Sequence, residues 1–377
     1  MRIGVNARVL LSNRMEGVAR YIYEVTRRMA MDHPEDEIIL FFDRRFDPAF
    51  IFGSNVKGVK IGLPARHPAL FKLWFEVSIP RALKKHKIDV FFSGDAYLSL
   101  RSKVPAVMVS HDLAYIHYPE HIPHSQLKYY QKYFPRFHGR ADHIIAVSQA
   151  TKDDIIDQYG ISTDKISIGY NSSPEGFSPV SLTVKKEMQR KYSGGNPYFV
   201  YLGSLHPRKN ITNLINAYDR YRHKRGGHNH LVIIGRAAWK YDTIKSVYDQ
   251  SPFRDDIHIY HNIGEEAKQI LASAEALIYI SLFEGFGIPI LEAFSAEIPV
   301  ITSNVSSMPE VAKDAAILVD PTDIDNISKA MIDIKNDHQK SELISKGKSR
   351  LQYFDWKNTA DIVYQCIKQV YLHHKGI

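Results

Sequence analysis

The chain has 377 residues, enough for two domains of ~100 to 200 residues each, and its hydrophobic fraction of 44% excludes collagen, coiled coil and general disorder. The 49 Lys and Arg against 41 Asp and Glu give a formal net charge of +8, which favours an anionic partner. Nucleic acid is not expected as that partner, because the basic residues outside 84–87 are dispersed instead of forming runs.

The single cysteine, Cys366, rules out an internal disulfide, and no Cys/His group has the spacing of zinc ligands. The chain enters a strand-like segment at its first residues, and no apolar run approaches the ~18 residues that a membrane span requires. We therefore expect a cytoplasmic protein without a structural metal, signal peptide or membrane-spanning segment. Such a protein could still lie peripherally at the inner face of the membrane.

Short runs of β-branched and aromatic residues recur along the chain, each followed by a helical stretch. In the first half these runs occupy residues 3–5, 38–42, 90–93, 107–110 and 144–148. After a segment rich in turn residues at 169–176, they resume at residues 199–202, 231–234, 257–260, 277–280, 300–302 and 317–319. Such alternation predicts parallel, doubly wound sheets, so we expect an α/β protein whose two halves join near residue 175.

In open parallel sheets the ligand site lies beyond the carboxyl ends of the strands, so the loops after the strand-like runs are the places to search. The first such loop contains Gly17 in a Gly-x-Ala-Arg pattern, which lacks the full dinucleotide-binding fingerprint. The loop after residues 107–110 begins with His111. A histidine in this position is as compatible with a structural role as with one that faces a cleft.

Arg208 and Lys209 follow the run at residues 199–202 and open a helical stretch marked by Asn210 and the residues after it. Two cations at a helix N-terminus oppose the helix dipole. That arrangement makes sense if a phosphate binds between them, because Arg offers a bidentate fork and Lys a point charge. The alternative is a solvated basic turn, but the strand–loop–helix context favours phosphate binding.

The loop after residues 277–280 carries a second candidate site. Pro289 suits the first turn of a helix that begins near Ile288, and Gly287 before it lets the backbone approach a ligand closely. The unpaired N–H groups at this helix start suit an anionic or hydroxyl-rich group. Glu284 lies in the loop and Glu292 one turn into the helix, so the two carboxylates can reach different parts of one ligand. The alternative is two carboxylates favoured by the helix dipole alone.

Two acidic pairs come nearest to a metal-binding motif, Asp153 with Asp154 and Asp323 with Asp325. Each follows residues that cap helices, so both pairs are expected at helix beginnings, as caps or first-turn carboxylates. We expect neither pair to bind a metal.

Residues 71–85 mix aromatic and basic side chains. Such a segment could lie on an anionic membrane surface. The favoured interpretation is a helix that packs on the sheet just before the run at residues 90–93, with its basic side chains reaching into solvent.

Taken together, these motifs resemble the retaining nucleotide-sugar glycosyltransferases of family 4, which have the GT-B architecture. The resemblance extends over nearly the whole chain, and its most specific element is the Glu-x7-Glu pattern from Glu284 to Glu292. The matching segments are residues 1–4, 17–22, 111–113, 141–148, 203–210, 284–292, 298–301 and 308–316.

The resemblance implies two facing Rossmann-like domains, each with a parallel sheet, and a cleft between them. Residues 1–174 would form an acceptor-binding domain and residues 175–356 a domain that binds the nucleotide-sugar donor. The last helix, residues 357–377, would pack back on the first domain.

The resemblance also assigns roles toward the donor nucleotide. Arg208 and Lys209 would neutralise the pyrophosphate with help from the Gly17 loop. Glu292 would hold the ribose hydroxyls.

Around the transferred sugar, the resemblance implies two catalytic residues. Glu284, with the backbone of Phe286, Gly287 and Ile288, would contact the sugar and the distal phosphate. His111 would stand near the sugar from the opposite domain.

We therefore expect a retaining transferase that moves a sugar from a nucleoside diphosphate to a glycan or lipid-linked acceptor in polysaccharide biosynthesis. GDP-mannose is favoured as donor, because residues 111–120 look like those of bacterial mannosyl- or rhamnosyltransferases of surface polysaccharide assembly. No cofactor or metal is expected, since two cations stand where a metal would otherwise neutralise the pyrophosphate. The alternatives are a nucleotide-sugar epimerase or hydrolase of the same fold and a non-catalytic nucleotide-sugar binding protein.

Overall fold

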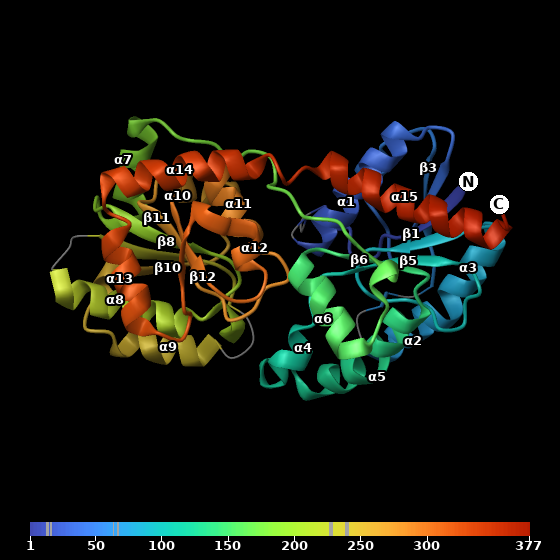
Figure 1. Cartoon of the computed structure of the whole chain (residues 1–377), viewed down its shortest axis with the longest axis horizontal. Helices are drawn as coiled ribbons and strands as arrows, with labels where there is room; N and C mark the ends of the chain where they lie inside the picture. The colour runs from blue at the N-terminus through green and yellow to red at the C-terminus, as the bar shows by residue number, and fades with distance from the viewer. Residues whose placement is uncertain (13–14, 16, 63, 66–67, 226–228, 238–240) are drawn as a thin grey trace. The chain divides into compact units, whose positions relative to one another are not determined.

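Two parallel β-sheets organise the computed structural model (Figure 1), which describes residues 1–12, 15, 17–62, 64–65, 68–225, 229–237 and 241–377. The chain divides into two compact units. Unit 1 is Met1–Asn171 with Asp355–Ile377, and unit 2 is Ser172–Phe354. The expected α/β class with two parallel, helix-covered sheets is confirmed.

Unit 1 contains a seven-stranded sheet in the order β3-β2-β1-β4-β5-β6-β7. Its strands are β1 (Arg2–Asn6), β2 (Glu37–Phe42), β3 (Val56–Lys60), β4 (Val90–Ser93), β5 (Ala106–Ser110), β6 (His143–Ala146) and β7 (Ile166–Ile168). Its helices are α1 (Val18–Asp32), α2 (Pro68–Leu73), α3 (Ile79–Lys85), α4 (Ala114–His117), α5 (His124–Arg140), α6 (Gln149–Tyr159) and α15 (Trp356–Lys375). The two strands absent from the sequence prediction, β3 and β7, are the edges of this sheet, where short or lysine-interrupted segments give no apolar run.

Unit 2 contains a six-stranded sheet in the order β10-β9-β8-β11-β12-β13. Its strands are β8 (Tyr198–Leu202), β9 (His230–Ile234), β10 (Ile257–Tyr260), β11 (Ala276–Tyr279), β12 (Val300–Ser303) and β13 (Ile317–Val319). Its helices are α7 (Leu182–Ser193), α8 (Ile211–Arg225), α9 (Tyr241–Gln250), α10 (Ala267–Ala272), α11 (Ile288–Ser295), α12 (Met308–Ala312), α13 (Ile324–Asp333) and α14 (Asp337–Leu351).

The two faces of the unit 1 sheet are covered by different helices. On one face, buried side chains of α3, α5 and α6 join alternate residues of the strands in one hydrophobic cluster. The intervening strand residues point the other way, because side chains alternate along a strand. On that side α1 and α15 pack together, and the Tyr21 ring lies edge-on to Trp356 at 5.6 Å.

The segment at residues 71–85 forms the end of α2, a π-helical turn η2 (Trp74–Ser78) and α3. Trp74 and Phe75 are each 1% exposed and belong to the cluster that covers the sheet. The interpretation of this segment as a helix packed on the sheet is therefore confirmed for its apolar side. Within the described residues, none of the helices is both long and apolar enough to cross a membrane.

The chain passes from unit 1 to unit 2 after Asn171 and returns after Phe354. Both crossings lie slightly before the expected divisions at residues 174/175 and 356/357. Ser172 donates a hydrogen bond to the Phe354 carbonyl at 2.7 Å, and Ser295 donates one to Ser173 at 3.0 Å, so the turn-rich segment already belongs to unit 2. The return to unit 1 begins at Asp355, whose side chain caps α15 by accepting from the backbone of Lys357.

Candidate active site

The strand order of unit 2 changes direction between β8 and β11. From β8 the chain builds β9 and β10 on one side, and it then returns to place β11, β12 and β13 on the other side. The loops after β8 and β11 therefore leave neighbouring strands in opposite directions, and ligands in such sheets bind at this switch point. Arg208 and Lys209 follow β8, and Glu284 follows β11.

The loop after β8 ends in a 3-10 turn, η5 (Pro207–Lys209), that carries both cations. The His206 side chain accepts a hydrogen bond from the backbone of Arg208, and Asn210 ends the turn in the left-handed conformation at φ 62°. The Asn210 amide donates to the carbonyl of Ile280 at 3.1 Å, which ties this loop to the end of β11. The expectation that the cations open the long helix is corrected, because α8 begins only at Ile211.

The side chains of Arg208, Lys209 and Glu284 form one cluster, in which Glu284 is buried and the two cations are partly buried. Lys209 Nζ lies 2.5 Å from Glu284 Oε1, and Arg208 Nη1 lies 3.2 Å from Glu284 Oε2. Tyr279, the last residue of β11, donates from Oη to Glu284 Oε1 at 2.9 Å and accepts from Lys209 Nζ at 2.8 Å. Two cations and one carboxylate leave the cluster with one net positive charge.

The protonation state of Glu284 follows from these contacts. The residue is 7% exposed. Burial alone would raise the pKa of Glu284, but Lys209 and Arg208 lower it to about 2. Glu284 is therefore ionised at neutral pH and acts as the counter-ion that holds the two cations, not as a proton donor.

The loop after β11 leads into α11 through residues that the sequence had indicated. Gly287 stands just before the helix at φ 101°, a left-handed conformation that favours glycine, and Pro289 occupies its first turn as expected. Ser307, from the loop after β12, donates to the carbonyl of Phe286 at 2.9 Å and to that of Glu284 at 2.8 Å. These bonds fix the backbone of residues 284–287 close to the cation cluster.

Glu292, in α11, is not bonded to that cluster. No hydrogen bond or ion pair joins it to Glu284, Arg208 or Lys209 within the described part of the chain. Burial raises the pKa of Glu292 to about 7, and the nearby charge of Lys268 opposes the shift only in part. The two carboxylates of the Glu-x7-Glu element thus differ, because Glu284 stays ionised at neutral pH whereas the pKa of Glu292 is raised to about 7.

Gly17 and His111 belong to unit 1. Gly17 is exposed and precedes α1 at φ 47°. His111 follows β5, and its Nε2 lies 2.8 Å from the carbonyl oxygen of Gly94. Because a carbonyl oxygen can only accept a hydrogen bond, Nε2 carries the proton, and Nδ1 of the neutral ring is an acceptor. Burial lowers the pKa of His111, which keeps the ring neutral at pH 7. Its edge-on contact with the Tyr21 ring at 5.5 Å fixes the ring plane.

Sequence reasoning missed a buried ion pair at the switch point of the unit 1 sheet, between β1 and β4. Arg8 Nη2 lies 2.8 Å from Asp95 Oδ2, and the guanidinium stacks 4.8 Å from the Tyr97 ring centre and 4.9 Å from that of Phe71. Asn6 donates to the other Asp95 oxygen at 2.7 Å. The available signal was that Arg8 and Asp95 each lie two residues beyond the end of a strand, but the adjacency of those strands is not visible in the sequence.

The acidic pairs lie outside both of these clusters. Asp323 caps α13 as expected. The first-turn assignment is wrong for Asp153 and Asp154, because Ser148 caps α6 and both residues therefore lie in the second turn of that helix. Asp154 instead contacts His117, whose Nε2 lies 2.8 Å from its carboxylate. Among the described residues, no group of three or more His, Cys, Asp or Glu could hold a metal ion.

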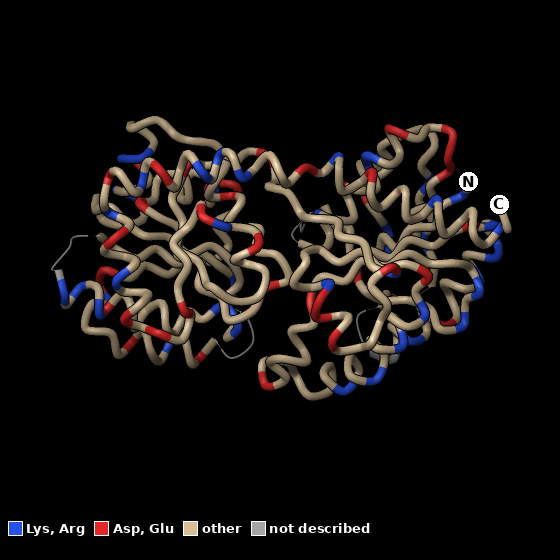
Figure 2. Tube along the Cα trace, viewed as in Figure 1, with Lys and Arg blue, Asp and Glu red and all other residues tan. Residues whose placement is uncertain are grey.

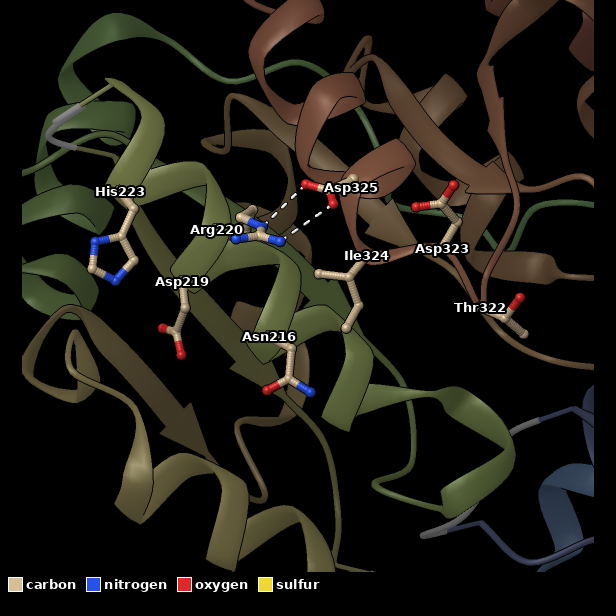
Figure 3. Close-up of a pocket in the computed structure, with 8 residues that line it drawn as sticks. All are labelled: Asn216, Asp219, Arg220, His223, Thr322, Asp323, Ile324 and Asp325. Atoms are coloured by element: carbon tan, nitrogen blue, oxygen red, sulfur yellow. Dashed lines mark hydrogen bonds and ion pairs between the residues drawn. The ribbon is translucent and has the colours of Figure 1, made fainter.

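An open groove of about 690 Å³ runs between α8 and the start of α13 (Figure 3). In it Arg220 bridges to Asp325 at 3.1 Å. The groove is lined by none of the residues that the sequence had indicated for ligand binding, so it is not the candidate site.

Two family models match the chain, one in each half. The model described as "Glycosyltransferase Family 4" matches residues 15–172, and the model described as "Glycosyl transferases group 1" matches residues 184–350. Among curated proteins, the chain is similar to O-antigen chain mannosyltransferase B of Escherichia coli, with 27% identity over 361 residues that cover 91% of this chain and 93% of the relative. It is also similar to O-antigen chain mannosyltransferase RfbU of Salmonella typhimurium, with 29% identity over 259 residues that cover 67% and 66%.

Solved structures agree on the fold. WaaG, a glycosyltransferase involved in lipopolysaccharide biosynthesis, superposes with a TM-score of 0.74 at 13% identity and covers 97% of this chain and 99% of its own. Anabaena HepE in complex with UDP and glucose gives a TM-score of 0.75 at 16% identity, with 98% and 100% covered. The expected GT-B fold is confirmed by these matches.

Proposed function

The chain belongs to the glycosyltransferases, and from this premise we propose that it transfers a sugar, with retention of anomeric configuration, from a nucleoside diphosphate to a glycan or lipid-linked acceptor. The observation that carries the proposal is the convergence of Arg208 and Lys209 on Glu284 at the switch point of the unit 2 sheet. We propose GDP-mannose as the donor and a surface polysaccharide as the product, because relatives of the chain are named O-antigen mannosyltransferases.

The chemical demand of this reaction is negative charge that grows on the departing pyrophosphate. Fixed cations in a buried site stabilise such charge without reorganisation during the reaction. Arg208 and Lys209 meet this demand, because Glu284 and Tyr279 hold them in place and the cluster keeps one net positive charge. The N–H groups of Gly287 and Ile288 at the start of α11 would add dipoles near the distal phosphate.

The other roles follow from position and charge. Glu292 on α11 would accept hydrogen bonds from the ribose hydroxyls, and the Gly17 loop of unit 1 would assist with the phosphates. Glu284 and the backbone at Phe286 would border the sugar. His111, with a neutral ring whose Nδ1 accepts, would receive a hydroxyl hydrogen bond from the sugar.

Donor binding should depend on pH through Glu292. Because its pKa is raised to about 7, the acceptor form of this carboxylate predominates above pH 7 and is lost below it. Affinity for GDP-mannose should therefore fall about tenfold from pH 8 to pH 6. In calorimetric titrations, Glu292→Gln should bind the donor more weakly at pH 8 and show a flat profile; a flat profile for the wild type would remove the ribose role.

Transfer should need no divalent metal. Arg208 and Lys209 supply the positive charge that Mg²⁺ or Mn²⁺ gives to the pyrophosphate in metal-dependent transferases. Activity should persist after exhaustive chelation with EDTA. Loss of activity that stoichiometric Mn²⁺ restores would show that the two side chains are insufficient.

Replacing His111 with Ala should cost about tenfold or more in turnover while donor affinity stays within several fold. The reason is that His111 belongs to unit 1, whereas Arg208, Lys209 and Glu292, which are the main nucleotide contacts we propose, belong to unit 2. The measurement pairs steady-state turnover with calorimetric donor binding. Full turnover in the variant would exclude a role of His111 at the sugar and leave it only its structural contacts, the hydrogen bond to Gly94 and the ring contact with Tyr21.

A panel of nucleotide sugars tests the proposal and its alternatives. A donor at ~100 times its dissociation constant should stabilise the chain by ~2.7 kcal/mol, which is visible in thermal unfolding. UDP-glucose belongs in the panel, because HepE is described in complex with UDP and glucose. Product analysis with and without acceptor then decides: sugar released or isomerised equally in both would indicate a hydrolase or epimerase, and binding without turnover would indicate a binding protein.

We place the reaction in the cytoplasm, with peripheral contact at the inner face of the membrane. The reason is chemical, since a lipid-linked acceptor presents its glycan at a bilayer surface.

A further inference from the structure

Aromatic rings enclose the largely buried guanidinium of Arg8. Its central carbon lies 4.8 Å from the ring centre of Tyr97 in the loop after β4, 4.9 Å from that of Phe71 in α2 and 5.7 Å from that of Phe75 in η2. Tyr129 of α5 packs on two of these rings, with its own centre 6.1 Å from that of Tyr97 and 6.4 Å from that of Phe71. The side chain of Arg8 is 11% exposed, so the guanidinium lies just beneath the surface of unit 1.

Glu76 brings a second carboxylate to the ion pair of Arg8 and Asp95. It lies in η2, and its Oε1 accepts from the backbone of Leu100 at 3.0 Å. Burial raises the pKa of Tyr129 most, and the charges of Glu76 and of the ion pair also act on that hydroxyl, so all three charged groups lie near it. We call Arg8, Glu76 and Asp95 the Arg8 cluster. Two carboxylates and one guanidinium leave it with one net negative charge.

The Arg8 cluster has unused hydrogen-bonding atoms. Within the described part of the chain, Arg8 Nε and Glu76 Oε2 are buried and have no hydrogen-bond partner. The Oδ2 atom of Asp95 has only its ion pair with Arg8. A buried donor or acceptor without a partner destabilises the folded chain. A cluster that keeps one donor and two acceptors open is therefore suited to a ligand that both donates and accepts.

The chemistry of these atoms selects a class of ligand. A sugar hydroxyl donates and accepts, so neighbouring hydroxyls of one ring can accept from Arg8 Nε and donate to the two carboxylates. A phosphate or carboxylate group only accepts, and it would meet one net negative charge in a largely buried site. The other cations of unit 1 do not reverse this preference, because Figure 2 shows Lys and Arg gathered along α2, α3 and α5, where solvent and salt screen surface charge.

We propose that the Arg8 cluster recognises the hydroxyl groups of an uncharged sugar at the end of the acceptor glycan. The cluster follows the carboxyl ends of β1 and β4, where the strand order of the unit 1 sheet changes direction and open parallel sheets bind ligands. The inference rests on the proposed function for the existence of an acceptor. It goes further in naming the groups that contact the acceptor and the charge that they exclude. Because the open atoms are covered, binding requires a neighbouring ring, such as that of the half-buried Tyr129, to move aside.

The test is a titration of the full chain, without donor, followed by ligand NMR. The two probes are methyl α-mannoside and methyl α-mannosiduronate, which is the same ring with a carboxylate. The wild type should bind the uncharged probe at least about tenfold more tightly than the anionic one. Equal binding of the two probes, or no binding of methyl α-mannoside, would overturn the proposal.

Two variants separate hydroxyl recognition from exclusion of charge. Arg8→Gln/Asp95→Asn removes both charges of the pair together, so no buried charge is left without its partner. This double variant should bind methyl α-mannoside at least about tenfold more weakly and still prefer it to the anionic probe, because Glu76 remains. Glu76→Gln keeps an oxygen for the backbone of Leu100 and brings the net charge of the cluster to zero, so the preference should shrink several fold. Wild-type binding by the folded double variant, or an unchanged preference in Glu76→Gln, would contradict the assignment.

A matched control removes a carboxylate elsewhere in unit 1. Glu24 of α1 is 4% exposed and pairs with Arg28 and, at 3.4 Å, with Arg20. Glu24→Gln should bind both probes as the wild type does, and equal changes in Glu24→Gln and Glu76→Gln would contradict a defined subsite.

Donor binding and turnover keep the outcomes separate. GDP-mannose should bind the wild type and the variants of the Arg8 cluster equally, and a parallel loss of donor affinity would overturn an assignment to the acceptor. Binding of methyl α-mannoside needs no turnover. Absence of sugar transfer by a chain that binds this probe would therefore count against the proposed function alone.

Discussion

Replacing Lys209 with Met should lower the turnover of sugar transfer by about a hundredfold to a thousandfold. Loss of one fixed electrostatic group that stabilises charge in a transition state has effects of this size. Lys209 Nζ lies 2.5 Å from Glu284 and 2.8 Å from Tyr279 Oη, so its ammonium is already positioned before the donor arrives. Lys209→Arg should recover only part of the rate, because a planar guanidinium cannot occupy the place of the ammonium.

The control for this prediction is a lysine in a similar ion pair away from the switch point. Lys185 of α7 donates to Glu275 at 2.8 Å and is partly buried. Lys185→Met should cost some stability and leave turnover within about twofold. If Lys209→Met folded normally and kept the wild-type rate, the role of Lys209 at the pyrophosphate would be wrong.

The second large effect is expected for Glu284→Gln. The carboxylate is 7% exposed and faces two cations, so neutralising it leaves buried positive charge uncompensated. Removing one partner of a buried pair typically costs about 3 to 5 kcal/mol of unfolding free energy. Turnover should fall by about a hundredfold, while donor affinity changes by no more than a few fold, because Arg208 and Lys209 remain to bind the phosphates.

Chemical denaturation and steady-state kinetics on the same Glu284→Gln preparation separate the two effects. Glu275→Gln offers a matched comparison, since Glu275 also bridges two lysines and its oxygens lie 2.8 Å from Lys185 and 2.9 Å from Lys340. That variant should lose stability without losing turnover. A Glu284→Gln variant with unchanged turnover would reduce Glu284 to a structural ion pair.

The positions of Arg208, Lys209 and Glu284 in loops after strands could be predicted from the sequence, because strand-end loops are recognisable by their residues, but their ion pairs with one another could not. The adjacency of β8 and β11 then brings those loops together. Tyr279 could not be predicted, because a tyrosine at the end of an apolar strand is indistinguishable from a core residue. The Tyr279 hydroxyl contacts Glu284 and Lys209 only because the fold brings the loops after β8 and β11 together.

Other features of the site regions depend on the order of strands in a sheet or on which residue caps a helix. Local patterns of residues along the sequence reveal neither of these. Arg8 and Asp95 come together only because β1 and β4 are neighbours in the unit 1 sheet. The place of Asp154 within α6 was misjudged because Ser148, not a later residue, caps that helix. The sequence indicated the position of His111 at a strand end, but its bond to Gly94 and its neutral ring follow from burial.

The central claim is that the cation cluster of unit 2 binds the pyrophosphate of a nucleotide sugar. Calorimetric titration of GDP-mannose into the wild type and into Arg208→Gln/Lys209→Met tests it most directly. Each lost charge-assisted contact should cost ~1.5 to 3 kcal/mol, so the double variant should bind at least about a hundredfold more weakly at equal folding. Equal affinity of GDP-mannose for both proteins would contradict the account.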